Sequence, residues 1–159
     1  MKGRAGMVAS SQVNLADWTQ KAKDYVDSKQ HLLLPGIKQS TPWSQESLKA
    51  CEKWFLANAK TIPVPRRIEY EMFLGEGLRR RFSGQWAHAC ILDKKISHEH
   101  NLLGIYYPQL EQFDVTGSLL DNALAAKTGD FWASVFQLNE SLRLAGLTNW
   151  HAPGSVPPE

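Results

Sequence analysis

Cysteine is scarce in this chain, which has two cysteines among 159 residues and no C-x-x-C motif. The sequence therefore predicts neither a disulfide-stapled scaffold nor a zinc ribbon. Cys51 falls in a helical apolar pattern and Cys90 in an alternating, strand-like pattern, so we expect both to be buried, reduced thiols. A catalytic cysteine would need a histidine and an orienting group beside it in space, and no motif indicates one.

Long apolar runs are also absent. No window approaches the roughly 18 uninterrupted apolar residues that a membrane-spanning helix needs. The first residues, MKGRAGMVASSQVN, contain two basic side chains but no apolar segment of the signal-peptide kind. We therefore expect a soluble, cytoplasmic chain that does not contact a membrane.

Neither sign of charge is in large excess, because 18 basic and 16 acidic residues leave a net charge of +2. A dedicated nucleic-acid-binding protein is usually far more basic, so we do not expect nucleic acid as the partner. The charge is nevertheless uneven. Residues 1–65 carry nine basic and five acidic side chains, residues 66–100 seven and five, and residues 101–159 two and six. Such a gradient can present two faces of opposite potential to a protein partner.

Catalytic motifs are missing as well. The chain has no G-x-S-x-G, no P-loop and no G-x-G-x-x-G after a predicted strand. Asp114, Asp121 and Asp130 are explained as a turn residue, a helix-surface residue and a helix cap. We expect no catalytic residue and hence no enzyme.

The histidines leave one alternative open. His98 and His100 would lie on the same side of an extended strand, as a pair of metal ligands can, but they fall in a predicted loop. No other histidine or cysteine cluster has the spacing of metal ligands, so we expect no metal and no other cofactor. The alternative is a small hydrolase or transferase that uses His88 or His98 with an acidic partner.

What the sequence does contain suits one globular domain, with 43% hydrophobic and 10% aromatic residues. We expect a flexible arm over residues 1–13, a globular domain over 14–149 and a loose, proline-rich tail over 150–159. The segment Ile62-Pro63-Val64-Pro65 must be extended. It is predicted to separate an N-terminal helical layer, ending at about residue 62, from an α+β part that starts at 66.

Hydrophobic periodicity and helix caps predict five helices. They cover about residues 14–28, 41–61, 66–82, 119–127 and 130–145, with Asn14 capping the first and Thr41-Pro42 starting the second. Alternation predicts strands over 85–92 and 102–107, and 113–115 adds a possible third. The fold class is therefore α+β, with about five helices packed on a small two- or three-stranded antiparallel sheet.

Tryptophan is abundant, with six residues in the chain. Four of them follow helix or strand patterns and are expected in the core: Trp18, Trp54, Trp86 and Trp132. Trp43 and Trp150 lie near the ends of predicted elements. If either is exposed it becomes an interface candidate, because aromatic anchors dominate binding hot spots.

The segment Leu74–Trp86, LGEGLRRRFSGQW, has the densest pattern. Glu76 lies four residues before Arg80, which favours an ion pair on one helix face, while Arg79 and Arg81 are predicted to point elsewhere. These arginines fit either a solvated helix end or a site for a partner's carboxylate or phosphate. Gly75 and Gly77 each cost the helix about 1 kcal/mol relative to alanine, which predicts the close approach of another backbone.

This segment also supports a resemblance. A helix that ends in G-E-x-x-R-R, followed by a glycine, a tryptophan opening a strand, a second strand and a short helix, resembles small uncharacterised bacterial domains. Some of these domains are encoded as immunity proteins against secreted toxins. The resemblance covers about Tyr70 to Ala125 and implies a non-enzymatic binder with no catalytic residues.

From these observations we expect an immunity or regulatory protein that neutralises a protein partner by occlusion. The candidate partner-binding residues are Glu76, Arg79, Arg80, Arg81, Trp43 and Trp150.

Overall fold

A computed structural model of the chain describes residues 13–97 and 100–145. These ranges form five α-helices and one antiparallel sheet with the strand order β1-β2-β3, so the predicted α+β class and the third strand are confirmed. The main elements are α1 (Leu15–Asp27), α2 (Gln45–Asn58), α3 (Val64–Phe82), β1 (Gln85–His88), β2 (Leu103–Tyr107), β3 (Gln112–Val115), α4 (Thr116–Ala126) and α5 (Phe131–Leu144). Three short 3-10 helices accompany them: η3 (Gln30–Leu33), η4 (Ala59–Thr61) and η5 (Ala89–Ile91).

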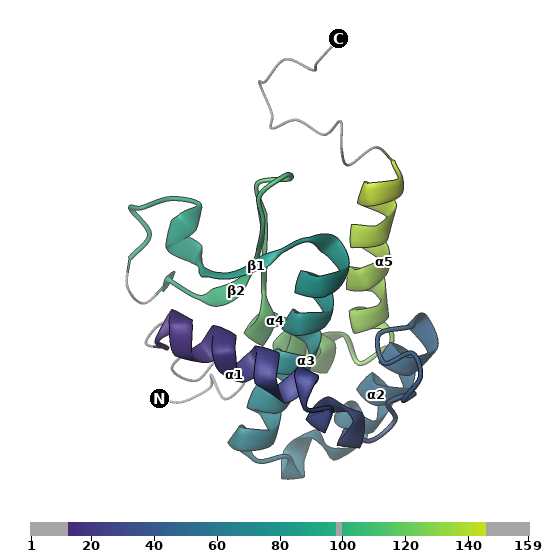
Figure 1. Cartoon of the computed structure of the whole chain (residues 1–159). Coiled ribbons are helices and arrows are strands. Elements are labelled where there is room, and N and C mark those ends of the chain that lie inside the picture. The colour runs from purple at the N-terminus through teal and green to yellow at the C-terminus, as the bar shows by residue number, and fades with distance from the viewer. Residues whose placement is uncertain (1–12, 98–99, 146–159) are drawn as a thin grey trace.

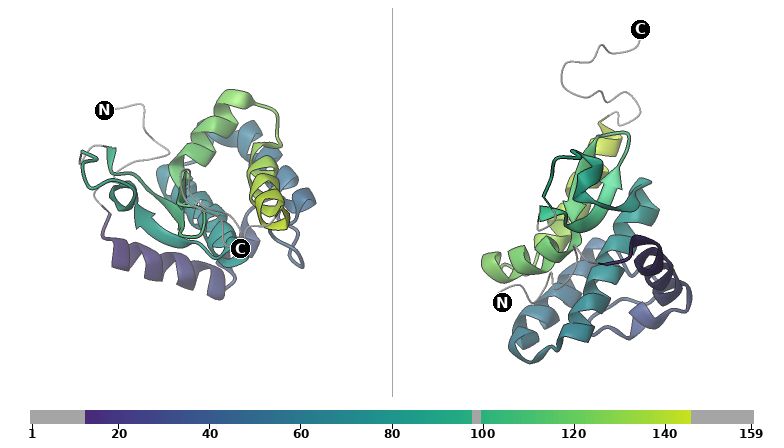
Figure 2. Two further views of the ribbon diagram at one scale, coloured as in Figure 1. Left: turned by 90° about the horizontal axis from the view of Figure 1, so that it is seen from above. Right: turned by 90° about the vertical axis from the view of Figure 1, so that its left-hand side faces the viewer.

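Helix α3 lies at the centre of the molecule (Figure 1). It contacts α1, α4, α5 and the strands β1 and β2, and every residue from 70 to 78 is buried. The other views show α1 along one side of this centre and α2 and α5 on another (Figure 2). A helix that is buried around its whole circumference must be enclosed by other elements, so α3 organises the fold.

Strands β1 and β2 contribute Trp86, Leu103, Ile105 and Tyr107 to the hydrophobic cluster that the helices share. Trp86 of β1 pairs with Ile105 of β2, which pairs with Asp114 of β3, and residues paired in this way share one face of the sheet. Asp114 therefore lies in a strand, and its predicted place in a turn is wrong. Its carboxylate accepts hydrogen bonds from the Tyr107 hydroxyl (2.8 Å) and from the Asn139 amide of α5 (3.3 Å), which tie the sheet to α5.

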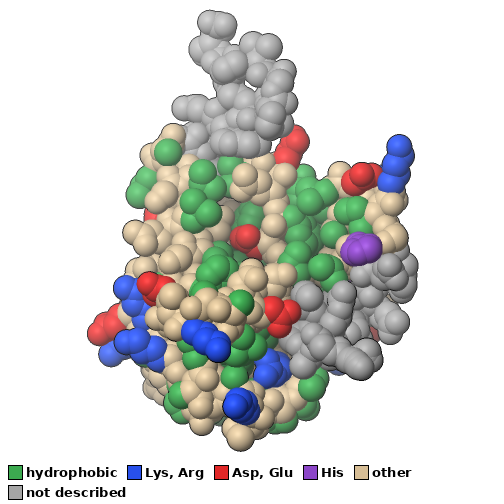
Figure 3. Space-filling view, turned by 180° about the vertical axis from the view of Figure 1, so that it is seen from behind, with side chains coloured by type: hydrophobic (Ala, Val, Ile, Leu, Met, Phe, Trp, Pro, Cys, Tyr) green, Lys and Arg blue, Asp and Glu red, His purple; other side chains and the backbone are tan. Residues whose placement is uncertain are grey.

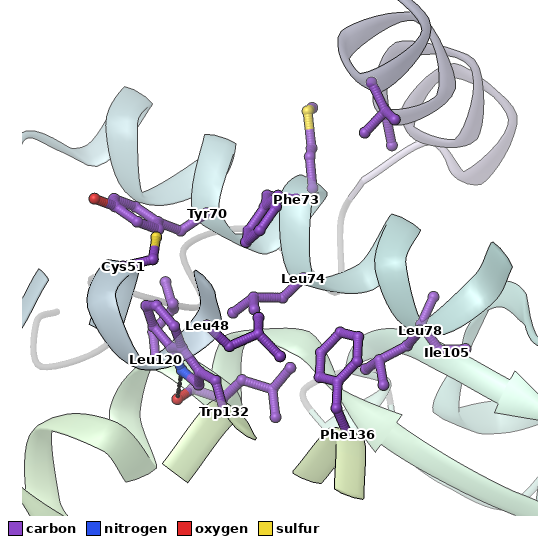
Figure 4. Packing of buried hydrophobic residues seen from close by; sticks show 14 of the residues in the cluster. Leu48, Cys51, Tyr70, Phe73, Leu74, Leu78, Ile105, Leu120, Trp132 and Phe136 are labelled. Atoms are coloured by element: carbon purple, nitrogen blue, oxygen red, sulfur yellow. Dashed lines mark hydrogen bonds between the residues drawn. The ribbon is translucent and has the colours of Figure 1, made fainter. Parts of the chain in front are cut away.

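One hydrophobic cluster joins helices that precede and follow the Ile62–Pro65 segment. At its centre, the ring of Phe55 from α2 lies 5.0 Å from that of Tyr70 and 5.2 Å from that of Trp132. The indole N–H of Trp132 donates a hydrogen bond to the Leu119 carbonyl at 2.8 Å (Figure 4). The predicted N-terminal helical layer and the α+β part therefore share one core.

Helix α2 differs from its prediction at two places. It begins at Gln45 rather than at Thr41-Pro42, because Ser44 supplies the cap: the Ser44 hydroxyl accepts from the Ser47 N–H at 3.1 Å. The buried face follows Leu48, Cys51 and Phe55, and Trp54 lies beside that face with 39% of its surface exposed. The expectation of a buried Trp54 is wrong.

Strand β1 is shorter than predicted and ends at His88 instead of Leu92. The side-chain oxygen of Asn101 accepts a hydrogen bond from the Cys90 N–H at 2.7 Å, which draws the chain out of the sheet into η5. Cys90 is consequently exposed, contrary to expectation, whereas Cys51 is buried as expected. Burial, with the nearby Glu52 charge, raises the pKa of the Cys51 thiol to about 12.

Among the described residues, no helix has both the length and the apolar character needed to cross a membrane.

Candidate functional site

The Glu76 carboxylate sits at the centre of the G-E-x-x-R-R motif and is fully buried. Arg79 donates two hydrogen bonds to it, both at 2.9 Å, and Arg80 donates one at 2.8 Å. The indole N–H of Trp86 donates a fourth at 2.7 Å. Burial alone would raise the pKa of Glu76, but the bonds from Arg79, Trp86 and Arg80 together lower it. The predicted Glu76–Arg80 pair is confirmed, and the prediction that Arg79 points elsewhere is wrong.

The three consecutive arginines connect α3 to its neighbours. Arg80 also donates to Asp27 of α1 at 2.9 Å. Arg81 donates to the Trp43 carbonyl at 3.2 Å and to Glu140 of α5 at 3.3 Å. Between 29% and 44% of each arginine side chain remains exposed, but each charge already faces a carboxylate of this chain. The motif therefore serves the fold, and a role of Arg79, Arg80 and Arg81 in partner binding stays a prediction.

Of the two candidate tryptophans, only Trp43 lies within the described residues, and it is half-buried rather than exposed. Its indole stacks on His31 at 5.2 Å and on Phe73 at 5.4 Å, and its N–H donates to the Phe73 carbonyl at 2.9 Å. A ring held in this way contributes to the core more than to an open surface. Trp150 lies outside the described residues, so its candidacy stays a prediction.

The two glycines of the motif are required by these aromatic rings. A Cβ added at Gly75 would collide with the Trp86 ring, and one added at Gly77 would collide with the Trp43 ring. The predicted close approach to α3 is therefore made by two indole side chains, not by another backbone.

Two further buried carboxylates also have structural partners. Glu52 of α2 accepts hydrogen bonds from the backbone N–H groups of Phe131 (3.2 Å) and Trp132 (2.7 Å), so it caps α5 from another helix. Asp130 occupies the N-cap position as predicted, but its side chain makes no cap bond. Glu71 is bonded by the Thr116 hydroxyl at 3.1 Å, and burial raises its pKa to about 8.

In the described parts of the chain, the histidines do not cluster with other potential metal ligands. Over residues 13–97 and 100–145, no group of three or more histidine, cysteine, aspartate or glutamate side chains could hold a metal ion. His88 is half-buried at the end of β1, and the ring of His100 is hydrogen-bonded to the Ser97 hydroxyl at 2.8 Å. His98 lies outside the described residues.

A cleft with five apolar residues and two polar residues in its lining lies where η3, the end of α2, η4 and the start of α3 meet. These elements are at the lower end of the molecule in Figure 1. We call this depression the Leu33–Trp54 cleft. Its volume is about 220 Å³. It is lined by Leu33, Pro35, Trp54, Thr61, Ile62, Pro63 and Arg66. Leu33 is 76% exposed and Trp54 39% exposed, so two large apolar side chains of the lining face solvent.

The part of the chain that forms this cleft is basic. Residues 28–68 contain seven lysines and arginines and only two glutamates, Glu46 and Glu52, and Glu52 is fully buried. Within the described ranges, exposed Lys29, Lys53 and Lys60 have no ion-pair partner. In the view from behind, most of the visible basic side chains lie over the lower part of the molecule (Figure 3).

A second cleft lies beside the start of α1 and is lined by Val13, Asn14, Asp17, Trp18 and Lys21. It lies where the described residues begin, and we assign it no role.

No family model, no curated protein and no solved structure matches this chain.

Sequence reasoning missed the Leu33–Trp54 cleft. The signal was present in two apolar segments that contain proline, HLLLPG and IPVP, because proline interrupts a helix and leaves apolar side chains at the ends of short elements. Leu33 ends η3, and α3 begins at Val64, so the prediction that residues 62–65 are all extended is wrong for Val64 and Pro65. Trp54 was assigned to the buried face of α2, which removed the one aromatic residue that would have marked the site.

Proposed function

We propose that this chain is a non-enzymatic protein-binding protein of the immunity or regulatory type, which acts by covering a surface of its partner. The observation that carries the proposal is the Leu33–Trp54 cleft, a concave surface with exposed Leu33 and Trp54 in its lining, formed by the most basic part of the chain. Exposed apolar patches rimmed by polar residues mark interaction sites in soluble proteins. The cleft, rather than the arginine motif, is the surface that we assign to the partner.

The composition of the cleft favours binding over catalysis. Its only polar side chains are those of Thr61 and Arg66, and neither is a usual general base at neutral pH. A tryptophan at the wall of a depression is a common anchor of protein interfaces. His88 lines neither of the two clefts described above, so nothing in their geometry favours the hydrolase or transferase alternative.

Affinity capture from an extract of the source cells, with wild-type chain and two variants, tests the proposal. Leu33→Glu places a charge at the cleft, and Leu138→Glu places the same charge on α5, where Leu138 is 61% exposed. The proposal predicts a protein that wild-type and the Leu138 variant retain equally and that the Leu33 variant loses. A partner that all three capture equally, or no partner at all, contradicts it.

The immunity version makes a narrower prediction. Co-expression of the chain with a toxin encoded beside it should restore growth, and Leu33→Glu should abolish this protection while Leu138→Glu preserves it. Growth arrest in the presence of the wild-type chain contradicts the immunity role and leaves the regulatory one.

A further inference from the structure

Arg66 is the one charged side chain in the wall of the Leu33–Trp54 cleft. Its guanidinium lies 3.6 Å from the Glu69 carboxylate, beyond hydrogen-bond distance, and 41% of the side chain is exposed. Within the described ranges the Arg66 side chain donates no hydrogen bond. An arginine has five N–H donors in a planar fork, so Arg66 can donate hydrogen bonds to a ligand in addition to its ion pair with Glu69.

The neighbouring Arg67 shows the contrast. Its guanidinium donates to the Ala59 carbonyl at 2.9 Å and lies over the Phe55 ring at 5.7 Å. Arg67 is therefore committed to closing the turn between η4 and α3. Arg66 and Arg67 are adjacent and carry the same charge, but only Arg66 lines the cleft.

Glu69 offsets part of the Arg66 charge, because the two groups form an ion pair at 3.6 Å. Its carboxylate accepts a hydrogen bond from the Tyr25 hydroxyl of α1 at 3.1 Å, which holds it on the side of α3 that faces α1. Lys29 immediately precedes η3, which supplies Leu33, and Lys60 immediately precedes Thr61 of the lining. Both lysines are exposed and add positive charge next to the segments that form the cleft. An incoming carboxylate would therefore be attracted before contact.

We propose that the occupant of the Leu33–Trp54 cleft is an acidic segment of the partner protein, an inference that rests on the function proposed above. The segment inserts an apolar side chain between Leu33 and Trp54 and sets a carboxylate against the Arg66 fork. Arginine and a carboxylate can form two parallel charge-assisted hydrogen bonds, and the apolar lining supplies the remaining contact area. Arg66 is then the residue that determines specificity for acidic over basic segments.

Three synthetic 12-residue peptides test the chemistry directly. The first carries two leucines and four glutamates, the second replaces the glutamates by lysine, and the third replaces the leucines by serine. Titration is followed by the backbone amide signals of Leu33 and Ile62 and by the Trp54 indole signal in ¹H–¹⁵N spectra. The first peptide should bind with a dissociation constant of about 100 μM, in the range of a small interface. The other two should bind at least tenfold more weakly.

Two variants that each remove one positive charge test whether binding of the acidic peptide depends on the cleft. Arg66→Gln should weaken binding of the acidic peptide by about tenfold, the loss of a charge-assisted contact. Lys94→Gln, which alters an exposed residue on the loop between β1 and β2, should change it by less than twofold. Leu33→Ser tests the apolar contact and should leave the fold intact, because Leu33 is largely exposed.

Several results would overturn the inference. Equal binding of the basic peptide, signal changes outside the cleft, or an unchanged affinity in Arg66→Gln each contradict it. A dimer of the wild-type chain in sedimentation equilibrium that Leu33→Glu dissolves would assign the cleft to a second copy. If the peptides fail while the capture experiment yields a partner that depends on Leu33, the acidic segment is wrong and the proposed function stands.

Discussion

At the scale of single residues, charged groups that look ready for a partner are used inside this molecule. Glu76 accepts four hydrogen bonds from Arg79, Arg80 and Trp86 in a fully buried position. A buried carboxylate with full hydrogen bonding is retained at little net cost, whereas removal of one partner leaves charges uncompensated. These hydrogen bonds around Glu76 therefore stabilise the fold.

Glu76→Ala should lower the free energy of unfolding by about 3 kcal/mol, because the indole N–H of Trp86 and both guanidinium groups lose their acceptor. Urea unfolding measures the change. Glu46→Ala is the control, since 77% of the Glu46 side chain is exposed and its ion pair with Lys38 spans 3.5 Å; it should change stability by less than about 0.5 kcal/mol. Equal effects of the two substitutions would mean that the buried cluster contributes nothing special.

Glu71 gives the protein a pH-dependent stability. Burial raises its pKa from 4.5 to about 8, against the opposing hydrogen bond from Thr116. The folded chain therefore holds a proton that the unfolded chain has released between these two values. The stabilisation is complete below pH 4.5 and is lost as the pH rises to about 8.

Glu71→Gln keeps a hydrogen-bonding partner for Thr116 and removes the titration. The free energy of unfolding of the variant should equal that of wild-type near pH 4 and exceed it by roughly 4 kcal/mol at pH 8. Urea unfolding at the two pH values, with Glu46→Gln as the control, checks this. A stability difference that does not grow with pH would show that Glu71 is ionised in the fold.

Sequence reasoning reached only part of the Glu76 cluster. The spacing of Glu76 and Arg80 predicts their ion pair, but the bond from Trp86 depends on how β1 turns back against α3. That contact comes from tertiary packing, which helical spacing does not encode. The pair of Glu76 and Arg79 could have been predicted as well, because residues at i and i+3 are neighbours on a helix just as residues at i and i+4 are.

At the scale of elements, α3 is built to receive two indole rings. Glycine inside a helix is normally a weakness, and Gly→Ala at an unobstructed helical site stabilises a protein by about 0.4–1 kcal/mol. At Gly77 the new methyl group would instead meet the Trp43 ring.

Gly77→Ala should therefore destabilise the chain by about 1–3 kcal/mol. Introducing Trp43→Leu as well makes room for the methyl group, so the cost of Gly77→Ala should fall in that background. A double-mutant cycle by urea unfolding measures the coupling. Additive effects of the two substitutions would contradict the packing of Trp43 on Gly77.

Element boundaries were predictable where a local signal fixes them. Asn14 caps α1 as predicted, with its side chain accepting from the Asp17 N–H at 3.0 Å. Local signals do not predict a boundary that depends on a hydrogen bond to a side chain distant in sequence. Asn101 ends the extended path of β1 by binding the Cys90 N–H, and Glu52 rather than Asp130 caps α5. Neither partner is close in sequence, so no local pattern reveals it.

At the scale of the whole molecule, the chain separates a stabilising arginine motif from an open apolar cleft. The cleft lies in the more basic half of the chain, over residues 33–66. The cleft itself depends on three segments, around Leu33, Trp54 and Ile62, that meet only after folding. Its position could not follow from periodicity, which describes each segment separately.

The central claim is that this cleft is the surface that contacts a partner. Its most direct test places a photo-reactive amino acid at position 33 in one chain and at position 138 in another, and irradiates each with the captured partner. The account predicts a covalent adduct at position 33 in at least tenfold higher yield than at position 138, reduced again by Arg66→Gln. Equal yields, or a higher yield at position 138, would place the partner elsewhere and contradict the account.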